Sequence, residues 1–168
     1  MEVSQSDAQA LSSAAPSPFQ LKKILAPVDF SPASEQALRY AVSFAKQFQA
    51  ALTLVHVVQV NYGVGELGMV DVPMLETQIR ENASKRLDAL AQDEIPRKFS
   101  VETAVLTGRP ATEIVRLARE KDVDLIILAT HGHTGLKHVF LGSTAENVVR
   151  HAPCPVLTVR EQEREFLK

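Results

Sequence analysis

The stretch Asp124-Leu-Ile-Ile-Leu-Ala129, followed by Thr130-His-Gly132, decides how this chain folds. It is an uninterrupted apolar run of strand length, which is typical of a strand buried on both faces of a parallel sheet. The run leads into a loop and then into Ser143, where a helix is expected to begin. This arrangement predicts a central strand whose carboxyl end opens onto a loop suited to a ligand.

Strand-like and helix-like segments alternate before and after this run. Ser31 and Pro32 are suited to cap and open the first helix, because serine is a preferred N-cap and proline a preferred first helical residue. Alternating strands and helices imply parallel pairing with right-handed crossovers. The sequence therefore predicts an α/β fold with a single doubly wound five-stranded parallel sheet of order 3-2-1-4-5 and helices on both faces. The expected strands are 23–28, 51–58, 99–106, 124–129 and 155–159, and the expected helices begin at residues 32, 73, 110 and 143.

The totals limit what the protein does. A length of 168 residues fits one domain, and a net charge of −2 offers no basic excess for nucleic acid. No apolar run approaches the roughly 18 residues of a membrane helix, so we expect no membrane association. The single cysteine, Cys154, rules out an intramolecular disulfide and is expected to be a buried small hydrophobe. A cytoplasmic location fits these features.

The two ends of the chain differ in composition from its middle. Residues 1–20 are rich in Ser, Ala and Gln and are expected to form a disordered tail. Residues 161–168 form a short charged tail. The folded domain is therefore expected to span residues 21–160.

A ligand crevice is expected where the strand order reverses, between the first and fourth strands. The loops there begin at Asp29 and Thr130. Gly132 allows a close approach to the backbone, and Gly142-Ser143-Thr144 places two hydroxyls and unpaired N–H groups at a helix start, which suits phosphate. Ser143 and Glu146 also form a capping box, and the two roles are compatible.

Two other patterns are interpreted conservatively. Residues 63–68 match G-x-G-x-x-G but do not follow the first strand, so they favour a lid beside the pocket over a dinucleotide fingerprint. Four histidines lie near the fourth strand and helix, but their spacing does not match a metal site, so no metal is expected. These histidines are His131, His133, His138 and His151.

The segment after the fourth strand resembles the universal stress protein family. Nucleotide-binding members of that family carry G-x2-G-x9-G-[ST], and the matching positions here are Ala129, Gly132, Gly142 and Ser143. The segments 24–34 (ILAPVDFSPAS) and 130–159 also match, so the resemblance covers about residues 21–160. One position departs, because alanine replaces the first glycine. If that position requires positive φ, the alanine argues against nucleotide binding, whereas if it requires only a small side chain, which we expect, binding survives.

The resemblance implies that the protein binds an adenine nucleotide, ATP or ADP, with or without Mg²⁺. It implies that Asp29 accepts hydrogen bonds from the adenine amine or the ribose hydroxyls. The resemblance also implies a homodimer that forms through the C-terminal edge strand. The implied nucleotide-binding residues are Pro27, Val28, Asp29, Val57, Gly108, Leu128, Ala129, His131, Gly132, Gly142, Ser143 and Thr144.

Three functions remain open at this point. The first, which we favour, is a stress-response sensor or regulator that binds ATP. The second is a stress-response dimer that binds no nucleotide. The third is an enzyme such as a slow ATPase, and the sequence argues against it, because there is no Walker A motif and no S-G-G-x-D-S after the first strand. No catalytic residue is therefore predicted.

Overall fold

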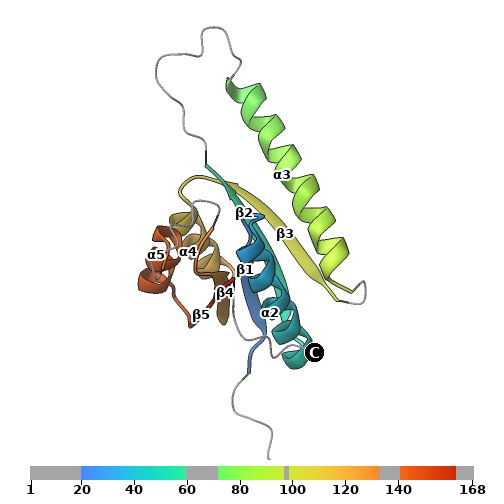
Figure 1. Ribbon diagram of the computed structural model, residues 1–168, viewed down its shortest axis with the longest axis vertical. Helices are drawn as coiled ribbons and strands as arrows, with labels where there is room; N and C mark the ends of the chain where they lie inside the picture. The colour runs from blue at the N-terminus through green and yellow to red at the C-terminus, as the bar shows by residue number, and fades with distance from the viewer. Residues whose placement is uncertain (1–19, 60–71, 97–98, 133–140, 162–168) are drawn as a thin grey trace, which may run out of the picture.

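The computed structural model describes residues 20–59, 72–96, 99–132 and 141–161, and Figure 1 shows how their helices and strands are arranged. Strands and helices alternate along the chain, as the apolar patterns predict. In chain order the elements are β1 (Lys23–Pro27), α2 (Pro32–Phe48), β2 (Ala51–Val58), α3 (Val72–Glu94), β3 (Val101–Thr107), α4 (Pro110–Glu120), β4 (Leu125–Ala129), α5 (Ser143–His151) and β5 (Val156–Val159).

The five strands form one parallel sheet of order β3-β2-β1-β4-β5, which confirms the predicted topology. β1 lies between β2 and β4, so the order of the strands reverses beside it. The edges are β3 and β5, as the predicted order requires. In the described part of the chain, no helix is both long and apolar enough to cross a membrane.

Helices cover both faces of the sheet, and each pair encloses its own apolar cluster. α2 and α3 cover one face, where Leu54 and Leu87 are fully buried. α4 and α5 cover the other face, where Val55 and Ile126 are fully buried. Neighbouring residues Leu54 and Val55 belong to opposite clusters because strand side chains alternate between faces. The apolar run of β2 is therefore explained by burial on both sides.

The first helix begins as its sequence predicts. Ser31 is the N-cap of α2, and its hydroxyl accepts a hydrogen bond from the Ser34 N–H at 3.2 Å, while Pro32 occupies the first turn. The Ser31 hydroxyl thus provides an acceptor for one of the amides that a helix start leaves unpaired. This cap fixes the direction in which the chain leaves β1.

The predicted capping box at Ser143 is wrong. The N-cap of α5 is Gly142, without a side-chain cap bond, and Ser143 is the first helical residue. The Gly142 N–H donates to Thr130 O at 2.8 Å, which fixes the turn one residue earlier than the pattern suggests. The Glu146 carboxylate, expected to reach back to the cap, instead pairs with Arg150 at 2.8 Å.

Several predicted features lie outside the described residues. They are most of the two tails, the G-x-G-x-x-G pattern at 63–68, and the loop histidines His133 and His138. Those predictions remain as they stand. The described part contains both ends of the predicted phosphate loop, at Gly132 and at Leu141.

Candidate functional site

A cavity of about 470 Å³ opens at the carboxyl ends of β1, β2 and β4. Its size lies within the range of about 300–1,000 Å³ that is usual for small-molecule sites. Eleven of the twelve residues predicted to bind a nucleotide line it: Pro27, Val28, Asp29, Val57, Leu128, Ala129, His131, Gly132, Gly142, Ser143 and Thr144. The structure therefore brings together residues that lie more than 100 positions apart in the sequence.

Asp29 is held on the inner side of this cavity by the start of α2. Its Oδ1 accepts hydrogen bonds from the Ser31 N–H at 3.0 Å and from the Ser31 hydroxyl at 2.5 Å. Its own N–H donates to the Ser34 hydroxyl at 3.4 Å. Because Ser31 is also the N-cap of α2, the cap and the carboxylate form one network. The half-buried carboxylate is thus oriented by the helix that follows it.

Gly132 lies directly against Asp29. A Cβ added to Gly132 would overlap with Asp29 Oδ2 and would come within 3.3 Å of Asp29 Cγ. The close approach expected at this glycine therefore exists, and its neighbour is the Asp29 side chain. This contact joins the loop after β1 to the loop after β4, on the two sides of the strand-order reversal.

Ala129 adopts ordinary strand geometry. It is the last residue of β4 and pairs with Val159 of β5. Among the described residues, positive φ outside glycine occurs at Phe30, Gln49 and Asp122, so the alanine occupies a position that requires no glycine backbone. In this chain the position takes a small side chain at the wall of the cavity without strain.

The start of α5 also lines the cavity. Gly142 packs close to the end of β4, since a Cβ there would come within 3.1 Å of Thr130 O. The first intrahelical bond runs from the Glu146 N–H to Gly142 O at 2.9 Å. The amides of Ser143, Thr144 and Ala145 precede that bond, and such amides favour anionic ligands. The two hydroxyls of Ser143 and Thr144 lie beside them.

Gly108 does not line the cavity, although the resemblance implies that it does. Its φ is +148°, and a Cβ there would come within 3.0 Å of Glu113 Cγ. Its N–H donates to Val58 O at 3.0 Å, which places it at the turn between β3 and α4. The residue that reaches the cavity from this turn is Pro110.

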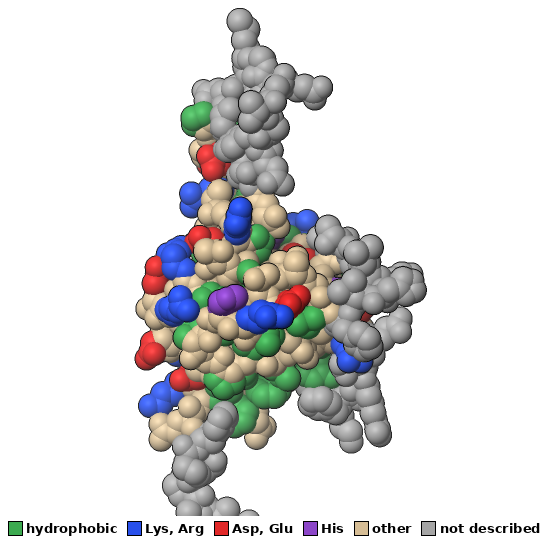
Figure 2. Space-filling view, turned by 90° about the vertical axis from the view of Figure 1, so that its left-hand side faces the viewer, with side chains coloured by type: hydrophobic (Ala, Val, Ile, Leu, Met, Phe, Trp, Pro, Cys, Tyr) green, Lys and Arg blue, Asp and Glu red, His purple; other side chains and the backbone are tan. Residues whose placement is uncertain are grey.

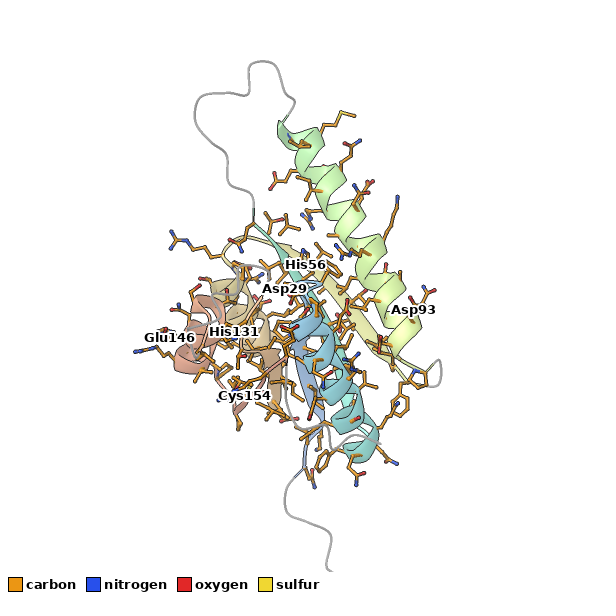
Figure 3. All side chains as sticks on the ribbon, viewed as in Figure 1. Asp29, His56, Asp93, His131, Glu146 and Cys154 are labelled. Atoms are coloured by element: carbon orange, nitrogen blue, oxygen red, sulfur yellow. The ribbon has the colours of Figure 1, made fainter. Side chains whose placement is uncertain are left out.

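Four polar residues that line the cavity are not among the predicted site residues: Ser34, His56, Gln59 and Thr130. Thr130 is buried and its hydroxyl lies 3.0 Å from His131 Nδ1. The His56 Nδ1 lies 2.8 Å from Val28 O. In Figure 3, Asp29 and His56 lie together, whereas Cys154 and Asp93 lie away from them. The signal in the sequence is that His56 is the one ionisable residue of β2.

Cys154 lies outside the cavity lining and is half-buried. Burial raises the pKa of its thiol, and the negative charge of Asp124 raises the pKa further. Both effects favour the protonated thiol, which is a weak nucleophile. In the described residues, no group of three or more His, Cys, Asp or Glu side chains is placed to hold a metal ion.

The chain matches the family model described as the universal stress protein family over residues 20–160. It is 35% identical to the universal stress protein MJ0531 of Methanocaldococcus jannaschii over 144 residues, which cover 86% of this chain and 85% of that protein. It is also 31% identical to MJ0577 of the same organism, over 84% of this chain and 96% of that protein.

Solved structures share the fold. The structure of MJ0577 superposes with a TM-score of 0.74 and covers 87% of this chain and 100% of that chain. A universal stress protein from Archaeoglobus fulgidus, solved in complex with dAMP, superposes with a TM-score of 0.53 at 22% identity, over 83% of this chain and 97% of that chain. At that identity the likeness concerns the fold.

Proposed function

The chain belongs to the universal stress protein family, and from this premise we propose that it binds an adenine nucleotide, ATP or ADP, as a sensor or regulator in a stress response. The observation that carries the proposal is the contact between Asp29 and Gly132 inside the cavity that also contains the start of α5. A carboxylate and a helix start in one cavity suit a ligand with hydroxyl or amine donors in one part and phosphates in another.

We call the part of the cavity formed by Asp29 the nucleoside wall and the part formed by the start of α5 the phosphate wall, and we assign a different part of the ligand to each. The Asp29 carboxylate repels phosphate, so we assign it to the ribose hydroxyls or the adenine amine. The amides of Ser143 and Thr144 attract anions, so we assign them to the phosphates. The apolar side chains of Val57, Leu128 and Ile114, which also line the cavity, suit the flat faces of the adenine base.

A structure of the same fold provides a precedent for the nucleoside part of this assignment. The universal stress protein of Archaeoglobus fulgidus was solved with dAMP, an adenine nucleotide. The end of β1 and the end of β4, where we place the ligand, lie within the segment that matches the family. When Mg²⁺ is bound, we place it on the phosphates.

The first experiment asks whether the protein carries or binds a nucleotide. The protein is purified without added nucleotide and denatured, and the extract is analysed by mass spectrometry. Binding of ATP and ADP is then measured by calorimetry with and without Mg²⁺. We expect an adenine nucleotide in the extract or saturable binding of one in solution. If neither is found, the chain is a family member that binds no nucleotide. Release of phosphate from bound ATP, measured in the same samples, would instead support a slow ATPase.

A second experiment tests the division of the ligand. Thr144→Val removes a hydroxyl from the phosphate wall and Asp29→Asn removes the charge from the nucleoside wall, while both keep the side-chain shape. Thr144→Val is expected to weaken the binding of ATP and inorganic tripolyphosphate severalfold, since one neutral hydrogen bond contributes about 0.5–1.5 kcal/mol. The binding of adenosine should not change. Asp29→Asn should weaken ATP and adenosine but not tripolyphosphate. The control is Thr112→Val, at an exposed position on α4.

We also propose that two copies associate through β5. Among the residues that the structure describes, this strand pairs with β4 alone, and its other edge faces away from the sheet. Figure 2 looks at the side of the molecule that carries α4, α5 and β5 and shows hydrophobic side chains gathered in the lower part of this face. An apolar surface next to an open strand edge suits a second copy of the chain.

A further inference from the structure

His56 contacts the residues on both sides of Asp29, and we infer that it is a positioning residue that holds Asp29 in place for the nucleotide. The inference rests on the proposed function, which it deepens. His56 is the third-last residue of β2, is half-buried and lines the cavity. The G-x2-G-x9-G-[ST] pattern, which matches residues 129–143 here, does not include this position.

The first contact is a hydrogen bond to Val28, the residue before Asp29. The His56 Nδ1 lies 2.8 Å from Val28 O. A carbonyl oxygen only accepts hydrogen bonds, so Nδ1 must carry the hydrogen. The bond thus fixes both the tautomer and the orientation of the ring. It also ties the carbonyl group before Asp29 to the neighbouring strand, β2.

The second contact is a ring contact with Phe30, the residue after Asp29. The two ring centroids are 4.6 Å apart, with the planes at 41°. The φ of Phe30 is +63°, a left-handed conformation that is unusual for a bulky residue and persists only when its surroundings impose it. Phe30 is buried against His56, which supplies part of that constraint.

α3 completes this arrangement from outside. The guanidinium carbon of Arg86 lies 4.1 Å from the centroid of the Phe30 ring, a cation–π geometry. Arg86 is exposed, so the contact covers the outer side of a ring that is itself buried. Arg86, Phe30 and His56 therefore form a continuous path from α3 to the cavity.

The consequence concerns the direction of the Asp29 carboxylate. Asp29 lies between an anchored carbonyl and an anchored ring, and its Oδ2 packs on Gly132. Ser31 holds the carboxylate from the side of α2, and we expect loss of either anchor on the side of β2 to let the backbone at Asp29 rotate and to turn the carboxylate from its position for the nucleoside. The phosphate wall, at the start of α5, does not depend on these contacts. His56 is therefore expected to affect recognition of the nucleoside and to leave recognition of phosphate unchanged.

The test compares two substitutions that each keep one contact. His56→Phe keeps a ring against Phe30 and removes the donor to Val28, whereas His56→Asn keeps a donor near the Nδ1 position and removes the ring. Affinities for ATP, 2′,3′-dideoxy-ATP and tripolyphosphate are measured by calorimetry. We expect His56→Phe to lower the affinity for ATP about tenfold, as for the loss of one well-placed hydrogen bond, and to leave the affinity for tripolyphosphate unchanged. The preference for ATP over the dideoxy nucleotide should fall, and His56→Asn should restore part of it.

A double-mutant cycle separates positioning from direct contact. In the Asp29→Asn background, His56→Phe should have no further effect on ATP, because the group that it positions has lost its charge. A full effect in that background would mean that His56 touches the nucleotide itself, and it would overturn the inference. An equal loss of ATP and tripolyphosphate affinity would also overturn it, since that is the result of general loosening.

Arg86 provides an independent arm if His56→Phe does not fold. Arg86→Met keeps the side-chain stem over Phe30 and removes the guanidinium, with Lys85→Met, exposed on the same helix, as the matched control. We expect weaker ATP binding than in the control, at unchanged tripolyphosphate affinity; equal ATP affinities would overturn the inference.

A wild-type protein that binds neither ATP nor tripolyphosphate would contradict the proposed function and leave the positioning itself to be tested by NMR. In the unliganded protein, His56→Phe or Arg86→Met should then shift the amide resonances of residues 29–31. Unshifted resonances would overturn the inference without any reference to the nucleotide.

Discussion

At the scale of single residues, Gly132 is explained by its neighbour. A Cβ on Gly132 would overlap with Asp29 Oδ2, so Gly132→Ala must displace the carboxylate or the loop after β4. We expect Gly132→Ala to lower the free energy of unfolding by about 1–3 kcal/mol, as overpacking usually does. Urea denaturation of the protein without nucleotide measures this effect.

The cause of that loss is tested by removing the carboxylate. Asp29→Ala opens the space that the new methyl group needs, so the double variant should be more stable than the sum of the two single effects predicts. Residues in contact typically show coupling of about 0.5–3 kcal/mol. Effects that add within experimental error would mean that Gly132 is required for another reason.

Cys154 gives a prediction on pH. Burial and the charge of Asp124 raise the pKa of its thiol, so the folded protein holds the proton more tightly than the unfolded chain does. The resulting stabilisation is fully present below the unfolded pKa of about 8.5 and is lost as pH rises through the higher folded pKa. We expect iodoacetamide to alkylate Cys154 more slowly in the native protein than in urea at pH 8.5.

The same shift affects stability. Between neutral and alkaline pH, the free energy of unfolding of the wild type should fall more steeply than that of Cys154→Ser, because serine does not ionise there. Parallel pH profiles of the two proteins, or a native thiol that reacts as fast as the unfolded one, would contradict the raised pKa.

The sequence predicts the residues of the site better than their contacts. Asp29, Gly132 and Thr144 were found because strand ends and helix starts can be located from apolar patterns. His56 was missed because an apolar pattern does not show which polar residue of a strand packs against the loop that follows a neighbouring strand. The contact of Gly132 with Asp29 was also out of reach, since 103 positions separate the two residues and only the sheet brings them together.

At the scale of elements, we expect substitution of the two serines at helix starts to affect stability differently. The Ser31 hydroxyl accepts from the Ser34 N–H and donates to Asp29 Oδ1, whereas Ser143 forms no cap bond. Ser31→Ala is expected to destabilise the protein by about 1–2 kcal/mol, the usual loss for an N-cap. Ser143→Ala should change stability by less than about 0.5 kcal/mol.

Thermal or urea unfolding of the two variants without nucleotide gives the comparison directly, and each serves as the control for the other. Equal losses would mean that Ser143 caps α5 after all. The contrast also shows why the sequence misplaced this cap. Both serines fit the local pattern, but the N-cap of α5 is Gly142, whose N–H donates to Thr130 O, and Thr130 lies outside the local pattern at the helix start.

Element boundaries follow the same division between local and distant causes. β2 and α5 have the predicted bounds, because turn residues delimit them. β4 begins at Leu125 and not at Asp124, because the Asp124 carboxylate accepts the N–H groups of Lys22 and Lys23, both at 2.8 Å. That contact joins the start of β4 to the start of β1, and no local pattern reports it.

At the scale of the whole molecule, the topology creates the cavity. The alternation of strands and helices was enough to predict the order 3-2-1-4-5, and that order places the loops after β1 and β4 side by side. The two clusters on opposite faces of the sheet then hold the loops from both sides. The cavity is therefore predictable as a place, whereas its polar contacts depend on side chains that only the folded structure brings together.

The last prediction concerns assembly through the edge of β5 that faces away from β4. Pro155 O accepts a hydrogen bond from the Ile126 N–H and Val159 O accepts one from the Thr130 N–H, so alternate residues from Pro155 to Val159 point their backbone groups towards β4. By this alternation, the N–H of Thr158 points away from the sheet. We expect the wild type to be a dimer by light scattering, with β5 of two copies paired at this edge.

Thr158→Pro tests the pairing, because proline removes the outward N–H and is tolerated at a sheet edge. It should give a monomer that retains the circular dichroism spectrum of the wild type. Thr158→Val is the matched control, since it keeps the N–H and the branched shape and should remain a dimer. A dimeric Thr158→Pro would place the interface elsewhere on the molecule, and a monomeric wild type at micromolar concentration would contradict the assembly itself.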